Sequence, residues 1–349
     1  MRQMRDITVV IVTHNRAGML QQTLACLAGL SYAARWQALV VDNGCTDDTP
    51  NVVRAARRHF PVRLQYICEP QLGKYRALNT AIAAVDTTFI AATDDDALPE
   101  PDWLCRAMEG FEQYRCDFVG GPVHPRWAGT PPSWLDPAAA TTGKVLGLQN
   151  HGPAPCEYGR DGISWPLGVN VAYRREACVH VGPFDARLGR VAGTLRNQSQ
   201  REWHLRARAA GLRGMYLPGM VVHHQVSRDR LTRAYFHRWF YWHGISRAVL
   251  CRAHHLHLLE PEHSATQAGE RELARVPLSL WRDAGRAFLS AGWRWVRARP
   301  DDALEYELRV AFWAGVLRER WRDEKRPGGL VAPTDAVPRP NHVTRSQAS

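Results

Sequence analysis

Residues 88–104 read TFIAATDDDALPEPDWL, and the rest of the chain is organised around this stretch. The apolar run 89–92 is typical of a buried strand, and it is followed at once by Asp94, Asp95 and Asp96, the aspartate triplet. Carboxylates crowded at a strand end repel one another, so their placement is easiest to explain if a cation neutralises them. Such oxygen ligands suit Mg²⁺ or Mn²⁺, whereas the simpler alternative is a solvated acidic turn.

Strand and helix patterns alternate upstream of the triplet. The β-branched run 7–12 (ITVVIV) is typical of a strand buried on both faces, as in a parallel sheet. We expect strands at 7–12, 38–41, 64–67 and 89–92, and helices at 19–27, 47–58 and 75–85. This βα order predicts an α/β fold, with a mostly parallel sheet and helices on both of its faces.

Polar residues follow three of the predicted strands, at the edge where parallel sheets bind ligands. They are Thr13-His14-Asn15, Asp42-Asn43-Gly44 and the aspartate triplet. No G-x-G-x-x-G follows the first strand, and no G-x-x-x-x-G-K-[ST] occurs anywhere. The sequence therefore predicts a ligand site at this edge, but neither a dinucleotide fingerprint nor a P-loop.

The composition is that of a globular protein, and its positive net charge favours an acidic partner. The 349 residues carry a formal net charge of +11, which favours nucleic acid, an anionic membrane or a phosphate-bearing substrate. The eight cysteines form no C-x-x-C pair, so we expect them to be reduced and the protein to be cytosolic. No apolar run approaches the roughly 18 residues of a membrane-spanning helix, so membrane contact is expected from one side only.

Residues 7 to about 226 resemble the family 2 glycosyltransferases of the GT-A fold, in which a nucleotide-sugar donor meets its acceptor above a single mixed sheet. The landmarks in the family's order are VVIVTHNR, VVDNG, GKYRALNTAI, TDDDALPEPDWL and GVNVAYRREACVHVGPFD. The resemblance implies a GT-A type, Rossmann-like mixed sheet with flanking helices, followed by a C-terminal helical region.

The resemblance also implies a donor site with a UDP-sugar as the favoured ligand. The donor-binding residues would be Thr13, His14, Asp42, Lys74, Asp94 and Asp95. His14 and Asp42 would hold the nucleobase, and Lys74 would lie near the nucleobase or diphosphate. The alternatives are that Asp42 caps a turn and that Lys74 is an exposed lysine.

A metal site and an acceptor site follow from the same resemblance. Asp96 would bind the Mg²⁺ or Mn²⁺ that bridges the diphosphate, and His224 would complete this site, unless it is a structural histidine. His223 would point to the opposite face of a regular strand. The acceptor-binding residues would be Trp165, Gly168 and Asn170.

The motif that supplies the catalytic base departs from the family's pattern. Family members have Glu-Asp, an acidic residue two positions on and then R-x-x-G; aligned on RARAAG, this chain has Ser199-Gln200-Arg201-Glu202. Glu202 is the remaining acid and is our predicted base, although two residues turn a helix by about 200°. The alternatives are another acid such as Asp161 or Asp185, a weak catalyst, or a Glu202 that is exposed and paired with Arg206.

The C-terminal part combines tryptophan with arginine at helical spacing. Segments 231–250, 281–295 and 302–321 show this pattern, which suits helices lying on an anionic bilayer. The alternative is that these helices pack on the catalytic domain or on a second subunit. No nucleic-acid partner is expected, because no binding module is recognisable.

We therefore predict a glycosyltransferase domain at 1–226, with a nucleotide-sugar-binding half (1–116) and an acceptor half (117–226). A basic, aromatic helical region (227–326) and a disordered tail (327–349) would follow. The expected function is inverting, metal-dependent transfer of a sugar to a glycan or lipid-linked acceptor in cell-surface polysaccharide synthesis, at the inner face of the membrane. The alternatives are a non-catalytic sugar-nucleotide or glycan binder, which Ser199-Gln200 would suit, and a nucleotidyltransferase, whose glycine-rich activation loop is absent.

Overall fold

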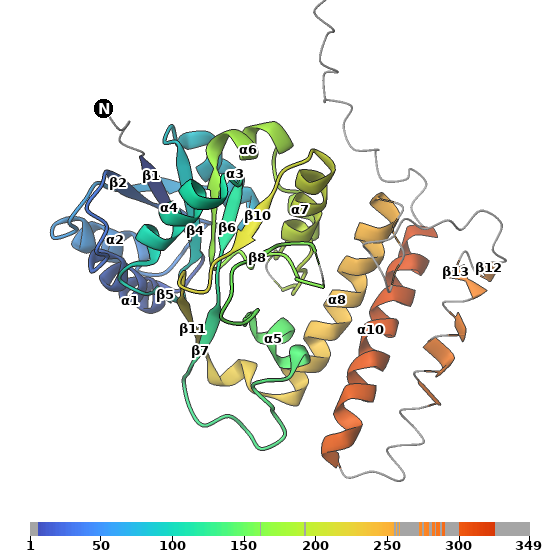
Figure 1. Cartoon of the computed structure of the whole chain (residues 1–349). Coiled ribbons are helices and arrows are strands. Elements are labelled where there is room, and N and C mark those ends of the chain that lie inside the picture. The colour runs from blue at the N-terminus through green and yellow to red at the C-terminus, as the bar shows by residue number, and fades with distance from the viewer. Residues whose placement is uncertain are drawn as a thin grey trace, which may run out of the picture.

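The computed structural model describes residues 6–160, 162–191, 193–254 and 300–324, together with 256, 258 and short pieces between 272 and 289. A mixed sheet with the order β3-β2-β1-β4-β9-β6-β10-β8 forms its centre (Figure 1). Its strands are β1 (Ile7–Thr13), β2 (Trp36–Asp42), β3 (Leu64–Cys68), β4 (Phe89–Asp94), β6 (Phe118–Gly120), β8 (Cys156–Glu157), β9 (Val171–Arg174) and β10 (Gly214–Tyr216). The four strands predicted from the sequence are confirmed, each within two residues of its predicted ends.

The register of β1 to β4 positions the site. These four strands run parallel, and Thr13 at the end of β1 pairs with Asp42 at the end of β2. On the other side of β1, Val12 pairs with Asp94. The polar residues that follow the strands are therefore brought to one edge of the sheet, as the βα order predicts.

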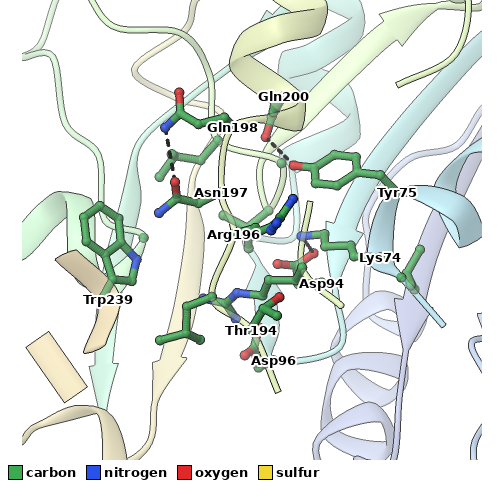
Figure 2. Close-up of a pocket in the computed structure, with 18 of the residues that line it drawn as sticks. Lys74, Tyr75, Asp94, Asp96, Thr194, Arg196, Asn197, Gln198, Gln200 and Trp239 are labelled. Atoms are coloured by element: carbon green, nitrogen blue, oxygen red, sulfur yellow. Dashed lines mark hydrogen bonds and ion pairs between the residues drawn. The ribbon is translucent and has the colours of Figure 1, made fainter. Parts of the chain in front are cut away.

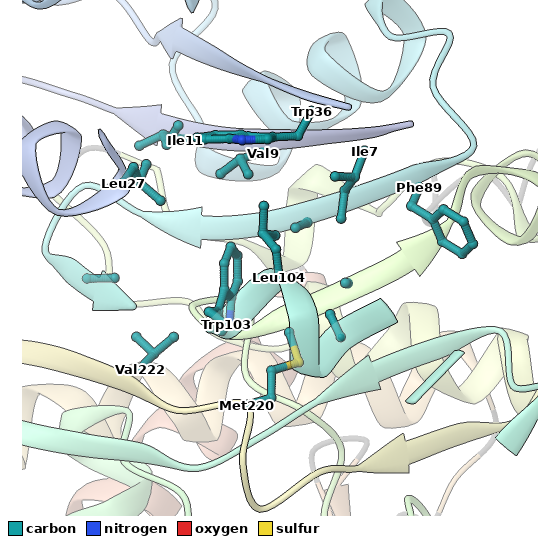
Figure 3. Packing of buried hydrophobic residues seen from close by; sticks show 14 of the residues in the cluster. Ile7, Val9, Ile11, Leu27, Trp36, Phe89, Trp103, Leu104, Met220 and Val222 are labelled. Carbon is teal, nitrogen blue, oxygen red and sulfur yellow. The ribbon is translucent and has the colours of Figure 1, made fainter. Parts of the chain in front are cut away.

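Helices cover both faces of the sheet. One face carries α1 (Ala17–Ala28), α2 (Thr49–Arg57) and α4 (Trp103–Tyr114), and the other carries α3 (Lys74–Ala84), α6 (Arg175–Val181) and α7 (Ser199–Ala209). Figure 3 shows the first face, where Val9 and Ile11 of β1 pack with Leu27, Trp36 and Leu104. Alternate residues of β1 belong to the two cores, so this strand is buried on both faces.

A second, three-stranded sheet includes the residues that directly follow the aspartate triplet. It consists of β5 (Ala97–Pro99), β11 (Val222–Val226) and β7 (Val123–Trp127), and β11 pairs His224 with Ala97, the residue after the triplet. His224 is buried, whereas His223 is half-buried and contacts Glu100 Oε1 at 2.7 Å. The predicted opposite orientation of the two histidines is confirmed.

The C-terminal helices pack on the catalytic part and on each other. α8 (Arg233–Ala253) lies beside α10 (Pro300–Glu324), and a Cβ added at Gly244 would lie 2.0 Å from the carbonyl oxygen of Phe312 (Figure 1). On α8, Phe236 and Trp239 are buried against Leu146. For α8 the structure therefore favours the packing alternative over a face laid on the membrane.

Short elements complete the described parts of the chain. They are α5 (Ala140–Leu146), the 3₁₀ turns Ala186–Leu188 and Arg228–Arg230, and strands β12 (Glu272–Leu273) and β13 (Val276–Pro277). Within the described ranges no helix has both the length and the apolar character needed to cross a bilayer. None of the eight cysteines forms a disulfide. The predicted tail at 327–349 and part of the segment 281–295 lie outside the described residues.

Candidate functional site

A cavity of about 600 Å³ opens where β1 and β4 end. Its lining includes the aspartate triplet, Lys74 and Gln200, and on α8 Trp239 (Figure 2). Figure 2 shows Lys74 and Asp94 on one side of the cavity and Trp239 on the other. The C-terminal region thus supplies a wall of the site, together with the part of the chain that precedes it.

The first two aspartates of the triplet are held by separate partners. Lys74 Nζ contacts Asp94 Oδ1 at 2.5 Å, which fixes the start of α3 against the end of β4. Asp95 is buried and accepts hydrogen bonds from Thr13 Oγ1 at 2.8 Å and Arg16 Nη1 at 3.0 Å. Burial raises the pKa of Asp95 to about 6, although Arg16 and Thr13 oppose this shift.

Asp96 has one satisfied and one unsatisfied carboxylate oxygen. Its Oδ2 accepts hydrogen bonds from Arg16 Nη1 at 2.9 Å and Arg230 Nη2 at 3.1 Å. Its Oδ1 is buried without a hydrogen-bond partner and lies 3.4 Å from His224 Nε2. Burial works against ionisation, but His224, Arg230 and Arg16 hold the pKa of Asp96 well below its usual range, so the carboxylate is charged at neutral pH.

The pair Asp96 and His224 could hold a divalent cation. Two neighbouring ligands of an octahedral cation, each about 2.1 Å from it, lie about 3.0 Å apart, close to the separation seen here. The unsatisfied Oδ1 supplies a free oxygen ligand at this point. No group of three or more His, Cys, Asp or Glu side chains suited to a metal occurs in the described part of the chain. The remaining ligands would have to be water and substrate phosphates, as is usual for Mg²⁺.

Asn43 organises the loop between β3 and α3, a role that the sequence did not indicate. Its Oδ1 accepts the Gly73 N–H at 2.7 Å, and its Nδ2 donates to the carbonyl oxygens of Glu69 and Gln71 at 3.0 and 2.8 Å. His14 Nδ1 contacts the Asn43 carbonyl oxygen at 2.7 Å. His14 and Asn43 both line the cavity and are held in one network.

Asp42, predicted to bind the nucleobase, lies beside the cavity and is not among the described residues that line it. Its carboxylate accepts the Cys45 N–H at 2.6 Å and a short hydrogen bond from the Tyr66 hydroxyl. These are the contacts of a turn-capping aspartate, the alternative stated above. Its binding role stays a prediction.

The three predicted acceptor-binding residues differ in position. Trp165 lines the cavity and stacks on His204 with ring centroids 5.4 Å apart. Gly168 also lines it, and a Cβ there would lie 2.6 Å from Gln200 Oε1, so a larger residue would require the end of this side chain to shift. Asn170 is fully buried and bonds to Trp103, Pro122 and Met220, which gives it a structural place behind the cavity wall.

Glu202, the predicted base, is not brought to the cavity. It is buried, accepts hydrogen bonds from Arg206 at 2.7 and 2.9 Å, and lies 3.2 Å from His254 Nε2. Gln200, two residues earlier on α7, lines the cavity instead, as the rotation of a helix requires. Of the other candidate acids, Asp185 is bonded to Arg187, and Asp161 lies outside the described residues.

Several residues that line the cavity were not predicted from the sequence. Arg16 follows the quoted THN directly, and Arg230 follows β11, but arginine in a loop carries no pattern that predicts a partner. On α8, Trp239, His243 and Arg247 all line the cavity. Their four-residue spacing indicates one helical face, which the sequence could not distinguish from a face laid on a membrane.

The family model described as glycosyl transferase family 2 matches residues 8–162. These residues form a family 2 glycosyltransferase domain. The domain is 30% identical to glycosyltransferase AglE of Haloferax volcanii over 118 residues. This alignment covers 34% of this chain and 39% of AglE. Succinoglycan biosynthesis protein ExoM of Rhizobium meliloti is 25% identical over 271 residues, 77% of this chain and 80% of that protein. The match thus spans less than half of AglE and most of ExoM.

Solved structures share the fold of this chain. A mannosyltransferase from Pyrobaculum calidifontis, in complex with GDP-Man and Mn²⁺, has a TM-score of 0.58 at 18% identity, covering 90% of this chain and 87% of its own. TarS residues 1–349 of S. aureus, in complex with UDP, has a TM-score of 0.50 at 14% identity and covers 91% of both chains. The predicted GT-A fold is confirmed.

We predict that replacing Glu202 by glutamine affects stability more than turnover. The change removes the charge that pairs with Arg206 and His254, so the free energy of unfolding should fall by about 1–3 kcal/mol. Release of nucleoside diphosphate from a sugar donor, measured well below the melting temperature, should stay near the wild-type rate. Glu176→Gln, at an exposed position of α6, is the control. Unchanged stability with a roughly hundredfold loss of turnover would instead indicate a catalytic base.

Proposed function

We propose that the protein transfers a sugar from a nucleotide-sugar donor to a hydroxyl of a glycan or lipid-linked acceptor, with inversion at the anomeric carbon. One observation carries this proposal: within a glycosyltransferase domain, the aspartate triplet and Lys74 line a cavity at the carboxyl edge of the sheet. The similarity to ExoM over most of both chains supports a role in polysaccharide synthesis. The UDP in TarS and the GDP-Man in the mannosyltransferase support a nucleotide donor, and we favour a UDP-sugar.

The donor would lie with its diphosphate among the cations at the strand ends. Lys74 and Arg16 line the cavity there and would face the phosphate oxygens. Asp94 and Asp95 would face the sugar and ribose hydroxyls, which their oxygens can accept. Because both aspartates are already held by partners in the protein, they are fixed before the donor binds.

We propose that Asp96 and His224 hold Mg²⁺ or Mn²⁺. A divalent cation bound there supplies positive charge against the diphosphate leaving group. Arg230 donates to Asp96 Oδ2 and to His224 Nε2, both at 3.1 Å, so it holds the two residues side by side. It would have to release the Nε2 lone pair when a cation binds there. The arginine also keeps Asp96 ionised, as a metal ligand must be.

Replacing Asp96 by asparagine tests this proposal. With a panel of UDP-, GDP- and dTDP-sugars, wild-type protein should release nucleoside diphosphate only when Mg²⁺ or Mn²⁺ is present. The variant should lose turnover by about 10²-fold or more, because it lacks the charge that holds the cation. The control is Asp102→Asn in the same segment, where the aspartate is half-exposed and pairs with Arg106. Wild-type turnover in Asp96→Asn, or in the presence of EDTA, would contradict the proposal.

A non-catalytic binder is the second candidate, because Gln200 lines the cavity where a carboxylate base is expected. Glutamine cannot take the acceptor's proton. If the missing base limits the reaction, Gln200→Asp should raise transfer by about tenfold or more, whereas Gln200→Asn should not. Nucleotide binding by calorimetry, with no transfer by the wild type or by either variant, would establish the binder.

We also propose peripheral contact with an anionic membrane at the inner face of the cell membrane. Phe288 and Leu289 are 68% and 72% exposed, and Arg282 and Arg286 lie on the same segment. The double variant F288S/L289S should sediment less with phosphatidylglycerol vesicles than the wild type, and neither should sediment with phosphatidylcholine vesicles. Equal sedimentation of both proteins with both kinds of vesicle would refute this contact.

A further inference from the structure

Cationic side chains also line the part of the cavity built from α5, α7 and α8. Lys144 comes from α5, Arg201 from α7 and Arg247 from α8, and all three line the cavity together with Trp239 and His243. Three elements far apart in the sequence therefore direct positive charge to one region. Trp165 and Gln200, which lie on the side predicted to receive the acceptor, line the same cavity.

Cationic side chains outnumber carboxylates among the described residues that line the cavity. Among the described lining residues, the carboxylates are the three of the triplet, and they already pair with Lys74, Arg16 and Arg230. The lining cations are eight: Arg16, Lys74, Lys144, Arg190, Arg196, Arg201, Arg230 and Arg247. An excess of this size in a concave site attracts an anion.

The three cations Lys144, Arg201 and Arg247 lie near enough to affect one another. Burial, then Arg247 and Arg201, lower the pKa of Lys144. Burial, then Arg247, Lys144 and Arg201, hold the pKa of His243 well below its usual value, so this ring is neutral at pH 7. Like charges held together cost stability, and such an arrangement is typical of a site that awaits an anionic ligand.

We propose that Lys144, Arg201 and Arg247 form a second anion site that holds a phosphate group of the acceptor. This inference rests on the proposed transferase function and selects, among its acceptors, one that carries phosphate close to the reacting sugar. Two arginines and a lysine converging from three elements offer more donors than a single carboxylate needs, whereas a phosphate presents three or more oxygens. Trp239 and Leu195, which line the same cavity, would contact the less polar part of the acceptor.

Inorganic phosphate is the probe for this site. The melting temperature of the full chain is measured with saturating UDP and Mg²⁺, which occupy the donor site, while phosphate is added against sodium chloride of equal ionic strength. We expect a further, saturable rise in melting temperature with phosphate. In the double variant K144Q/R247Q, the phosphate concentration for half of this rise should increase about tenfold or more, because two charge-assisted partners are lost.

Two controls separate the possible outcomes. Arg238→Gln, at an exposed position of α8 that does not line the cavity, should respond to phosphate as the wild type does. Stabilisation by UDP and Mg²⁺ should persist in the double variant, which shows that it folds and that its donor site is intact. No phosphate effect on the wild type, an equal effect on the double variant, or stabilisation by glucuronate in place of phosphate would overturn the inference. Absence of any UDP effect in the wild type would instead contradict the proposed function itself.

Discussion

Three adjacent carboxylates at the end of one buried strand are the constraint on which this structure depends. Asp95 and Asp96 are both nearly inaccessible to solvent, and buried charges must be paired or they destabilise the fold. The cations that pair with the triplet come from the start of α1, the start of α3 and the turn after β11. Segments more than a hundred residues apart are therefore tied to one strand end.

The same constraint prepares the site for chemistry. The partners of the triplet are fixed by the fold, so its oxygens are oriented without a ligand, and Asp96 keeps one oxygen unsatisfied beside His224. A site that is organised in advance loses less entropy on binding and stabilises developing charge without reorganisation. On the far side of the cavity, α8 closes the wall with Trp239 and His243, so the C-terminal region takes part in shaping the space for a substrate.

Local patterns predicted the four parallel strands β1 to β4 well, because these strands are continuous apolar runs that end at polar residues. The opposite faces of His223 and His224 also follow from sequence, through the two-residue period of a strand. Contacts between distant loops could not be predicted in this way. Arg16, Arg230 and Asn43 act through partners that only the folded chain brings near. Glu202 was predicted as the base from its residue type, and it lies away from the cavity for a different reason. The rotation of α7 turns Gln200 to the cavity and leaves Glu202 between Arg206 and His254.

A crystal structure of the protein with UDP and MnCl₂ is the most direct measurement of the central claim, that the strand-end cavity is a metal-dependent donor site. The account predicts UDP density in the cavity beside Lys74. It also predicts an anomalous Mn²⁺ peak within bonding distance of Asp96 Oδ1 and His224 Nε2, about 2.1–2.2 Å away. Nucleotide bound elsewhere, or bound in the cavity with no Mn²⁺ at Asp96, would contradict it.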